Sequence, residues 1–99
     1  MSHEYRITAV HLEPTNSQRF EHITAVMAAR VHSGESVQDD ERERSLQTIL
    51  NWIALGHTFY CRSKSGRADV VAYPKGAPRY IRTVRDGTES NNLLELRRF

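Results

Sequence analysis

The sequence has little of what common functional sites are built from. It contains a single cysteine, Cys61, which excludes an internal disulfide and is typical of the reducing cytoplasm. Cys61 follows Phe59 and Tyr60 in an apolar setting, which favours a buried structural thiol over a nucleophile. No apolar run approaches the roughly 20 residues of a membrane-spanning helix, and the N-terminus lacks the apolar stretch of a signal peptide. We therefore expect a cytoplasmic protein that does not enter a membrane.

Motifs for cofactor, metal and covalent chemistry are missing as well. There is no Gly-x-Gly-x-x-Gly, no phosphate-binding loop and no Gly-x-Ser-x-Gly. Of the five histidines, no two share the i, i+4 spacing of a helical metal site. We expect no metal, no cofactor and no catalytic residues, so that a small enzyme is only the third functional hypothesis.

What is present suits one small hydrophobic core. Ninety-nine residues, 38% of them hydrophobic and 26% charged, predict a single globular domain over residues 1–99. Residues 1–56 carry five basic and eight acidic side chains, whereas residues 57–99 carry nine basic and four acidic ones. This asymmetry indicates either a solubilising coat on exposed strands or a basic face that meets an anionic partner.

Two paired strands are predicted near the N-terminus. Residues 5–13 alternate and are rich in β-branched side chains, so we expect Tyr5, Ile7 and Ala9 on one side of a strand. Residues 21–30 repeat the Ile-Thr-Ala-Val of the first segment. Two strands of similar burial that pair with each other are the simplest interpretation.

A helix is predicted over residues 40–55. Asp40 and Glu43 fit a capping box at its start, in an acidic cluster that suits the positive end of the helix dipole. Gly56 is placed to end the helix in a left-handed turn. Apolar residues at helical spacing form one stripe, expected to be buried: Leu46, Ile49, Leu50 and Ile53.

After Gly56 the apolar residues no longer recur at helical spacing but at every second position, which is typical of strands. Residues 58–64, 68–73 and 79–85 are predicted as three strands of a meander, and residues 91–96 as a short closing segment against the core. The fold class is therefore α+β: a mainly antiparallel sheet of about five strands, in the order β-β-α-β-β-β, with one amphipathic helix on one face. The other face is solvated, or covered by loops or a partner.

The candidate binding surface lies on the last strands. Alternation groups aromatic and cationic side chains on one face, a combination that stacks nucleobases or anchors a protein interface. The ordinary explanation of the same residues is a sheet surface that the arginines merely solvate, with Tyr80 in the core. Polar residues around the final turn either cap that turn or bind a ligand. The whole candidate set is Tyr60, Arg62, Lys64, Tyr80, Arg82, Thr83, Asp86, Asn91 and Asn92.

A series of short motifs runs through nearly the whole chain. It comprises the opening strand, His22-Ile23-Thr24, the helix closing on Ile53 and Gly56, Phe59-Tyr60, Ala68-Asp69-Val70, Tyr80-Ile81-Arg82-Thr83, Asp86-Gly87 and Asn92-Leu93-Leu94. In this order and spacing the chain resembles family 3892 of the domains of unknown function, a group of small bacterial and phage-encoded proteins. The family pattern usually has Asp where this chain has Asn91, and it often ends in Leu-Pro and a cysteine where this chain has Leu-Arg-Arg-Phe. The resemblance implies one domain and no mechanism.

Three functions follow in order of preference. The first is a non-catalytic binding or accessory module that holds a protein partner on the exposed aromatic-basic sheet face. The alternative is nucleic-acid binding through the basic residues of 57–99. A small enzyme comes third, because the sequence shows no convergent set of polar residues.

Overall fold

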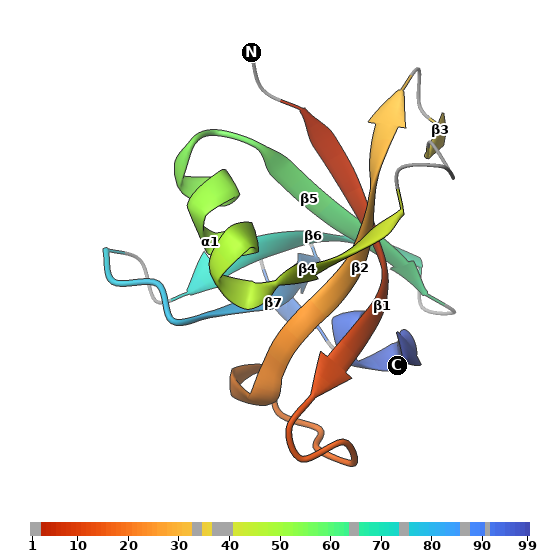
Figure 1. Ribbon diagram of the computed structural model, residues 1–99, viewed down its shortest axis with the longest axis vertical. Helices are drawn as coiled ribbons and strands as arrows, with labels where there is room; N and C mark the ends of the chain where they lie inside the picture. Colours follow the sequence, from red (N-terminus) through yellow and green to blue (C-terminus); the bar gives the residue numbers. More distant parts are fainter. Residues whose placement is uncertain are drawn as a thin grey trace.

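A single curled sheet runs through the computed structural model, which describes residues 3–32, 35–36, 41–63, 66–73, 76–85, 88–90 and 92–99 (Figure 1). Seven strands follow one another in the order β3-β2-β1-β5-β6-β7-β8, while β4 pairs with β2 and β9 pairs with β1. The strands are β1 (Glu4–Leu12), β2 (Ile23–His32), β3 (Glu35–Ser36), β4 (Arg42–Ser45), β5 (Thr58–Ser63), β6 (Gly66–Tyr73), β7 (Tyr80–Arg85), β8 (Thr88–Ser90) and β9 (Arg97–Arg98). The helical segments are α1 (Leu46–Ala54) and two short 3-10 helices, η1 (Phe20–His22) and η3 (Asn92–Glu95).

Strand β1 is an interior strand of the sheet and pairs with three others. Its antiparallel pairing with β2 confirms that the two N-terminal strands pair, and the predicted meander is present as β5-β6-β7. The other edge of β1 pairs in parallel with β5 along Glu4–Ile7 and with β9 at Ala9–Val10. The sheet is therefore mainly antiparallel, as expected, but it has more strands than the five predicted. The two parallel pairings join segments far apart in the sequence, which no local pattern indicates.

A bulge in β1 makes the predicted division of its faces wrong. The register with β2 shifts between Ile7 and Ala9, so Thr8 is an extra residue in this strand. An extra residue reverses which side chains point inward. The core side of β1 therefore passes from Tyr5 and Ile7 to Val10 and Leu12, while Ala9 does not join the core cluster.

The helix α1 is shorter than predicted, with nine residues. Residues 42–45, expected in its first turn, form β4 and pair with Ala25–Ala28 of β2. Glu43 lies in this strand opposite Met27 and does not cap the helix; Asp40 lies outside the described residues. Pairing with the β2 edge satisfies backbone groups that an exposed helical turn would leave to water, and it overrides the local helical pattern.

Ser45 caps the helix instead. Its Oγ accepts a hydrogen bond from the backbone N–H of Thr48 at 3.2 Å, and its φ and ψ are extended. We expect Ser45→Ala to lower the free energy of unfolding by about 1 kcal/mol, because it leaves a helix N–H without its acceptor. Urea denaturation measures the change, and Ser45→Asp, which keeps an acceptor, should restore most of it. An alanine variant as stable as the wild type would contradict the assignment of this cap.

The end of α1 follows the prediction. Gly56 has φ +98°, the left-handed conformation that a glycine adopts without strain. Its N–H donates to the Ile53 carbonyl at 3.0 Å, and the His57 N–H donates to the Trp52 carbonyl at 3.0 Å. This pair of bonds is a Schellman motif, and it turns the chain directly from α1 into β5.

The core fills the concave side of the sheet. Helix α1 contacts β2 and β4 as well as β5, β6 and β7, η1 contacts β7, and η3 packs on β5, β6 and β7. In Figure 1 the β1-β2 hairpin crosses the β5-β6-β7 meander, with α1 between them. Ile49 is fully buried. The other residues of the predicted helix stripe are partly buried and pack against the core: Leu46, Leu50 and Ile53. Within the described residues, no helix is long and apolar enough to cross a membrane.

Candidate binding face

Strands β5, β6 and β7 present a surface that points away from the core. Side chains alternate along a strand, and the core cluster takes Phe59, Cys61, Val70 and Ile81 from these strands. Their sequence neighbours therefore project from the opposite side. We call this side the outer face; its described residues are Thr58, Tyr60, Arg62, Arg67, Asp69, Val71, Tyr73, Tyr80, Arg82 and Val84.

Four of the predicted site residues share the outer face by alternation, but only Arg62 is exposed. Tyr60 is 5% exposed, and Tyr80 is partly buried and packs against the core cluster, as the alternative with Tyr80 in the core expected. Tyr60 and Arg62 lie on β5, and Tyr80 and Arg82 lie on β7. The register places Asp69 of β6 between the two strands, opposite Tyr60 on one side and Val84 on the other. Lys64, Asp86 and Asn91 lie outside the described residues.

Thr83 and Asn92 do not belong to an exposed surface. Thr83 is 0% and Asn92 2% exposed. The Thr83 Oγ1 accepts a hydrogen bond from the Leu93 N–H at 3.3 Å, and the Asn92 amide donates to the Ser63 Oγ and the Gly66 carbonyl at 3.1 and 3.0 Å. These bonds hold η3 on the core side of the sheet, which agrees with the turn-anchoring interpretation of this polar group.

Two arginine–tyrosine pairs cross the strands of the outer face. The Arg67 guanidinium lies 4.0 Å from the centre of the Tyr60 ring, and that of Arg82 lies 3.8 Å from the centre of the Tyr73 ring. The Tyr73 and Tyr80 rings are 5.7 Å apart. Sequence reasoning missed Arg67 and Tyr73, although both belong to the same alternating set on β6. Only the register shows that each faces a predicted residue across a strand.

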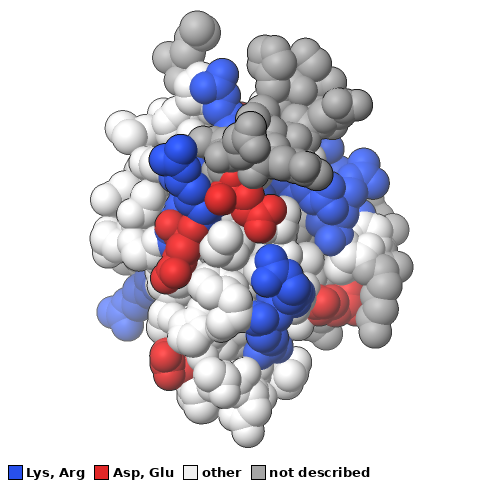
Figure 2. All heavy atoms as spheres, turned by 45° about the vertical axis from the view of Figure 1, so that its right-hand side comes forward, with Lys and Arg blue, Asp and Glu red and all other residues white. Residues whose placement is uncertain are grey.

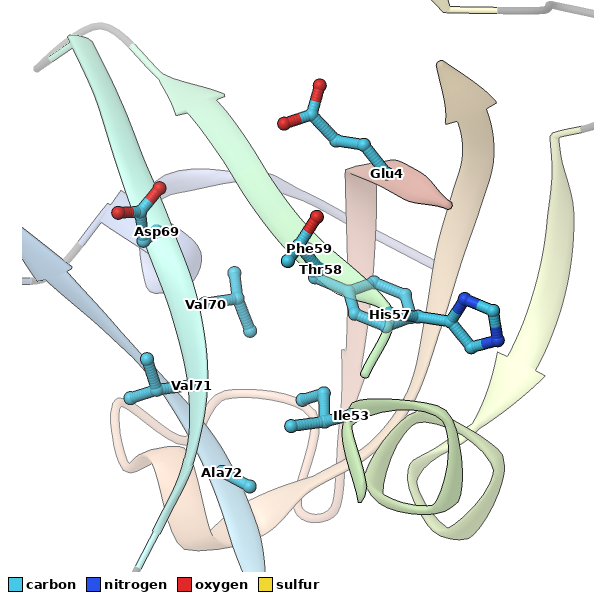
Figure 3. Close-up of a pocket in the computed structure, with 9 residues that line it drawn as sticks. All are labelled: Glu4, Ile53, His57, Thr58, Phe59, Asp69, Val70, Val71 and Ala72. Atoms are coloured by element: carbon cyan, nitrogen blue, oxygen red, sulfur yellow. The ribbon is translucent and has the colours of Figure 1, made fainter. Parts of the chain in front are cut away.

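A hollow of about 490 Å³ opens where β5 and β6 diverge (Figure 3). The two strands pair only from Phe59 opposite Val70 to the hairpin end, and α1 leads into β5 beside the rest of β6. In Figure 3, Ile53 and Val70 point into the gap from opposite sides, and Glu4 and Asp69 lie at one end. The lining residues are Glu4, Ile53, His57, Thr58, Phe59, Asp69, Val70, Val71 and Ala72.

An aromatic cluster supports the wall of the hollow. The centre of the Tyr5 ring lies 5.0 Å from that of Trp52 and 5.1 Å from that of Phe59. The His3 and His57 rings are stacked, with their centres 5.5 Å apart. The His3 backbone N–H donates to the His57 Nδ1 at 3.0 Å, so the ring proton of a neutral His57 is on Nε2. The sequence separates these two histidines by 54 positions, and their meeting follows from the parallel pairing of β1 with β5.

The histidines show no metal-binding arrangement in the part of the chain that is described, where no three His, Cys, Asp or Glu side chains converge. His11 has an acceptor at each ring nitrogen: Nδ1 contacts the Phe99 carbonyl oxygen, and Nε2 contacts Glu13 Oε1 at 2.9 Å. Both nitrogens can donate only in the protonated ring. The hydrogen bonds to Phe99 and Glu13 therefore raise the pKa of His11 above its ordinary value.

Comparison with known proteins gives one match. A family model described as "Protein of unknown function (DUF3892)" matches residues 6–97. No curated protein and no solved structure matches the chain.

Proposed function

The chain belongs to this family, whose description names no activity, and from the chain's own geometry we propose a non-catalytic binding module that holds a protein partner on the outer face. The observation that carries the proposal is the pair of cross-strand arginine–tyrosine contacts, Arg67 on Tyr60 and Arg82 on Tyr73. The single buried thiol suits a reducing compartment, so we place this binding in the cytoplasm.

The pairs favour binding because they orient the arginines in advance. A guanidinium lying on a tyrosine ring has fewer orientations to lose when its N–H groups bind a carboxylate. Arginine and tyrosine are also the residue types that most often dominate interface energies. Among its described residues the outer face carries Arg62, Arg67 and Arg82 against Asp69, and Glu4 of β1 forms an ion pair with Arg67 at 3.2 Å. The balance of these charges is still positive, so the face suits a partner with an acidic patch.

A protein partner fits these contacts better than nucleic acid. An unpaired base needs an open aromatic face on which to stack. Tyr60 is only 5% exposed, and the Arg67 guanidinium covers its ring. Figure 2 shows one side of the molecule, and there acidic and basic side chains lie next to one another and form no one-signed stripe of the kind that follows a phosphate backbone.

Affinity capture with two matched variants tests the proposal. Arg62→Ala/Arg82→Ala removes two cations from the outer face, and Arg19→Ala/Arg42→Ala removes the same charge from exposed positions elsewhere. We expect the wild type and the Arg19/Arg42 variant to retain the same protein from a nuclease-treated lysate of the native host. The Arg62/Arg82 variant should bind it at least about tenfold more weakly, because central interface arginines contribute a kilocalorie or more each. Near-ultraviolet circular dichroism checks that both variants fold.

Two results would contradict the proposal. Equal retention by both double variants would show that the outer face is not the binding surface. Binding of a single-stranded oligonucleotide that falls steeply with salt, and is lost only in the Arg62/Arg82 variant, would replace the protein partner with nucleic acid.

A further inference from the structure

The hollow between β5 and β6 is lined mainly by apolar and acidic residues, whereas the outer face beside it carries arginines. We infer that the hollow binds an organic cation with an apolar body, a protonated alkylamine or arylalkylamine. The ligand's apolar part enters the hollow, and its ammonium group lies between Glu4 and Asp69. This goes beyond partner binding on the outer face, because a free amine needs no partner protein.

The size and the floor of the hollow suit a small apolar body. Its volume of about 490 Å³ lies within the roughly 300–1,000 Å³ of small-molecule sites. Ile53, Phe59 and Val70 supply apolar surface on both sides of the gap. Phe59 is 2% and Val70 5% exposed, so both are held in the core and form a rigid base for the hollow. The partly exposed Ile53, Val71 and Ala72 offer most of its accessible apolar surface.

The charges at the mouth select a cation. Two of the nine lining residues are carboxylates, and none is a lysine or an arginine. The Glu4 Oε2 already contacts Arg67 at 3.2 Å, which offsets one negative charge. Asp69 has no ion-pair partner among the described residues, so one negative charge is left for a ligand. An anionic ligand would meet this remaining negative charge and is disfavoured by repulsion.

The protein carries its own reporter for this site. Trp52 is the single tryptophan, and its ring centre lies 6.1 Å from His57 and 6.4 Å from Phe59, both of which line the hollow. Three probes of nearly equal size separate charge from shape: phenethylamine is a cation at neutral pH, 2-phenylethanol is neutral, and 3-phenylpropionate is an anion. Each is titrated against the wild-type protein while Trp52 fluorescence and the backbone amide signals of Val71 and Ala72 are followed.

We expect phenethylamine to bind about fivefold more tightly than 2-phenylethanol, a ratio typical of one partly exposed charge pair, and 3-phenylpropionate to bind more weakly than the alcohol. Asp69→Asn, at an exposed position, should abolish the preference for the amine and leave the affinity for the alcohol unchanged. The matched control Glu21→Gln removes a carboxylate from η1, away from the hollow, and should change neither affinity. Equal binding of amine and alcohol, an unaltered preference in Asp69→Asn, or no response to any probe would overturn the inference.

A further arm distinguishes the source of the amine. N-acetyl-lysine methylamide presents the same ammonium on an alkyl chain within a peptide unit. Tighter binding of this compound than of phenethylamine assigns the site to a lysine side chain, and weaker binding assigns it to a free amine; both results support a cation site. If no amine binds, the inference about the hollow is wrong, but the capture of a protein partner through Arg62 and Arg82 is not affected. The two proposals can therefore be disproved independently.

Discussion

Alkylation of Cys61 is expected to be about a thousandfold slower in the folded protein than in the unfolded chain. Cys61 is 0% exposed, and its burial raises the pKa of the thiol from the ordinary 9.0 to about 12, with a smaller contribution from the charge of Glu95. Only an accessible thiolate reacts, so burial blocks the attack itself, and the raised pKa alone reduces the thiolate population about a thousandfold at neutral pH. Iodoacetamide labelling followed by mass spectrometry measures both rates.

The same reaction in denaturant is the control, because Cys61 is the only cysteine and must label fully there. The raised pKa also has a consequence for stability. The unfolded chain loses its thiol proton first as the pH rises above 9.0, so folding is expected to weaken progressively above that pH. Rapid labelling under native conditions would show that β5 does not bury this side chain.

Replacing Leu93 by alanine is expected to lower the free energy of unfolding by about 3 kcal/mol. Leu93 is 0% exposed, and η3 holds it against β5, β6 and β7. Removing three carbon atoms there opens a cavity that the surrounding strands can fill only partly, because the hydrogen bond from the Leu93 N–H to Thr83 keeps the backbone in place. Urea denaturation measures the loss.

Leu55→Ala is the matched control for this substitution. Leu55 is 74% exposed, so the same change should alter the free energy of unfolding by less than about 0.5 kcal/mol. Native-state labelling of Cys61 should also accelerate in Leu93→Ala, since both side chains belong to the same core cluster. Equal losses in the two variants would contradict the role of η3 as the segment that closes the core.

Local patterns were sufficient for the elements whose cause is local. The alternation of β5 and β6, the apolar stripe around Ile49 and the glycine at the end of α1 each depend on only a few neighbouring residues. The bulge at Thr8, the strand β4 and the parallel pairing of β1 with β5 depend on distant segments. Neither a capping motif nor a period of two carries information about such pairing.

The candidate site divides in the same way. Side chains alternate between the two faces along β5 and β7, and the pairing of both strands with β6 has no register shift. Local alternation therefore predicts which residues share the outer face: Tyr60, Arg62, Tyr80 and Arg82. The burial of Asn92 could not be predicted, because its hydrogen-bond partners Ser63 and Gly66 are distant in sequence. The hollow could not be predicted either, since it exists only where β6 continues beyond its pairing with β5.

Arginine footprinting on the complex with a captured partner tests most directly whether the outer face is the binding surface. Phenylglyoxal modifies exposed guanidinium groups, and mass spectrometry reads the extent at each arginine. Arg62 and Arg67 of the outer face, and Arg19 and Arg42 elsewhere, are all exposed in the free protein. Binding on the outer face predicts that the partner protects Arg62 and Arg67 while Arg19 and Arg42 react as before. Protection of Arg19 or Arg42, with Arg62 and Arg67 still fully reactive, would contradict it.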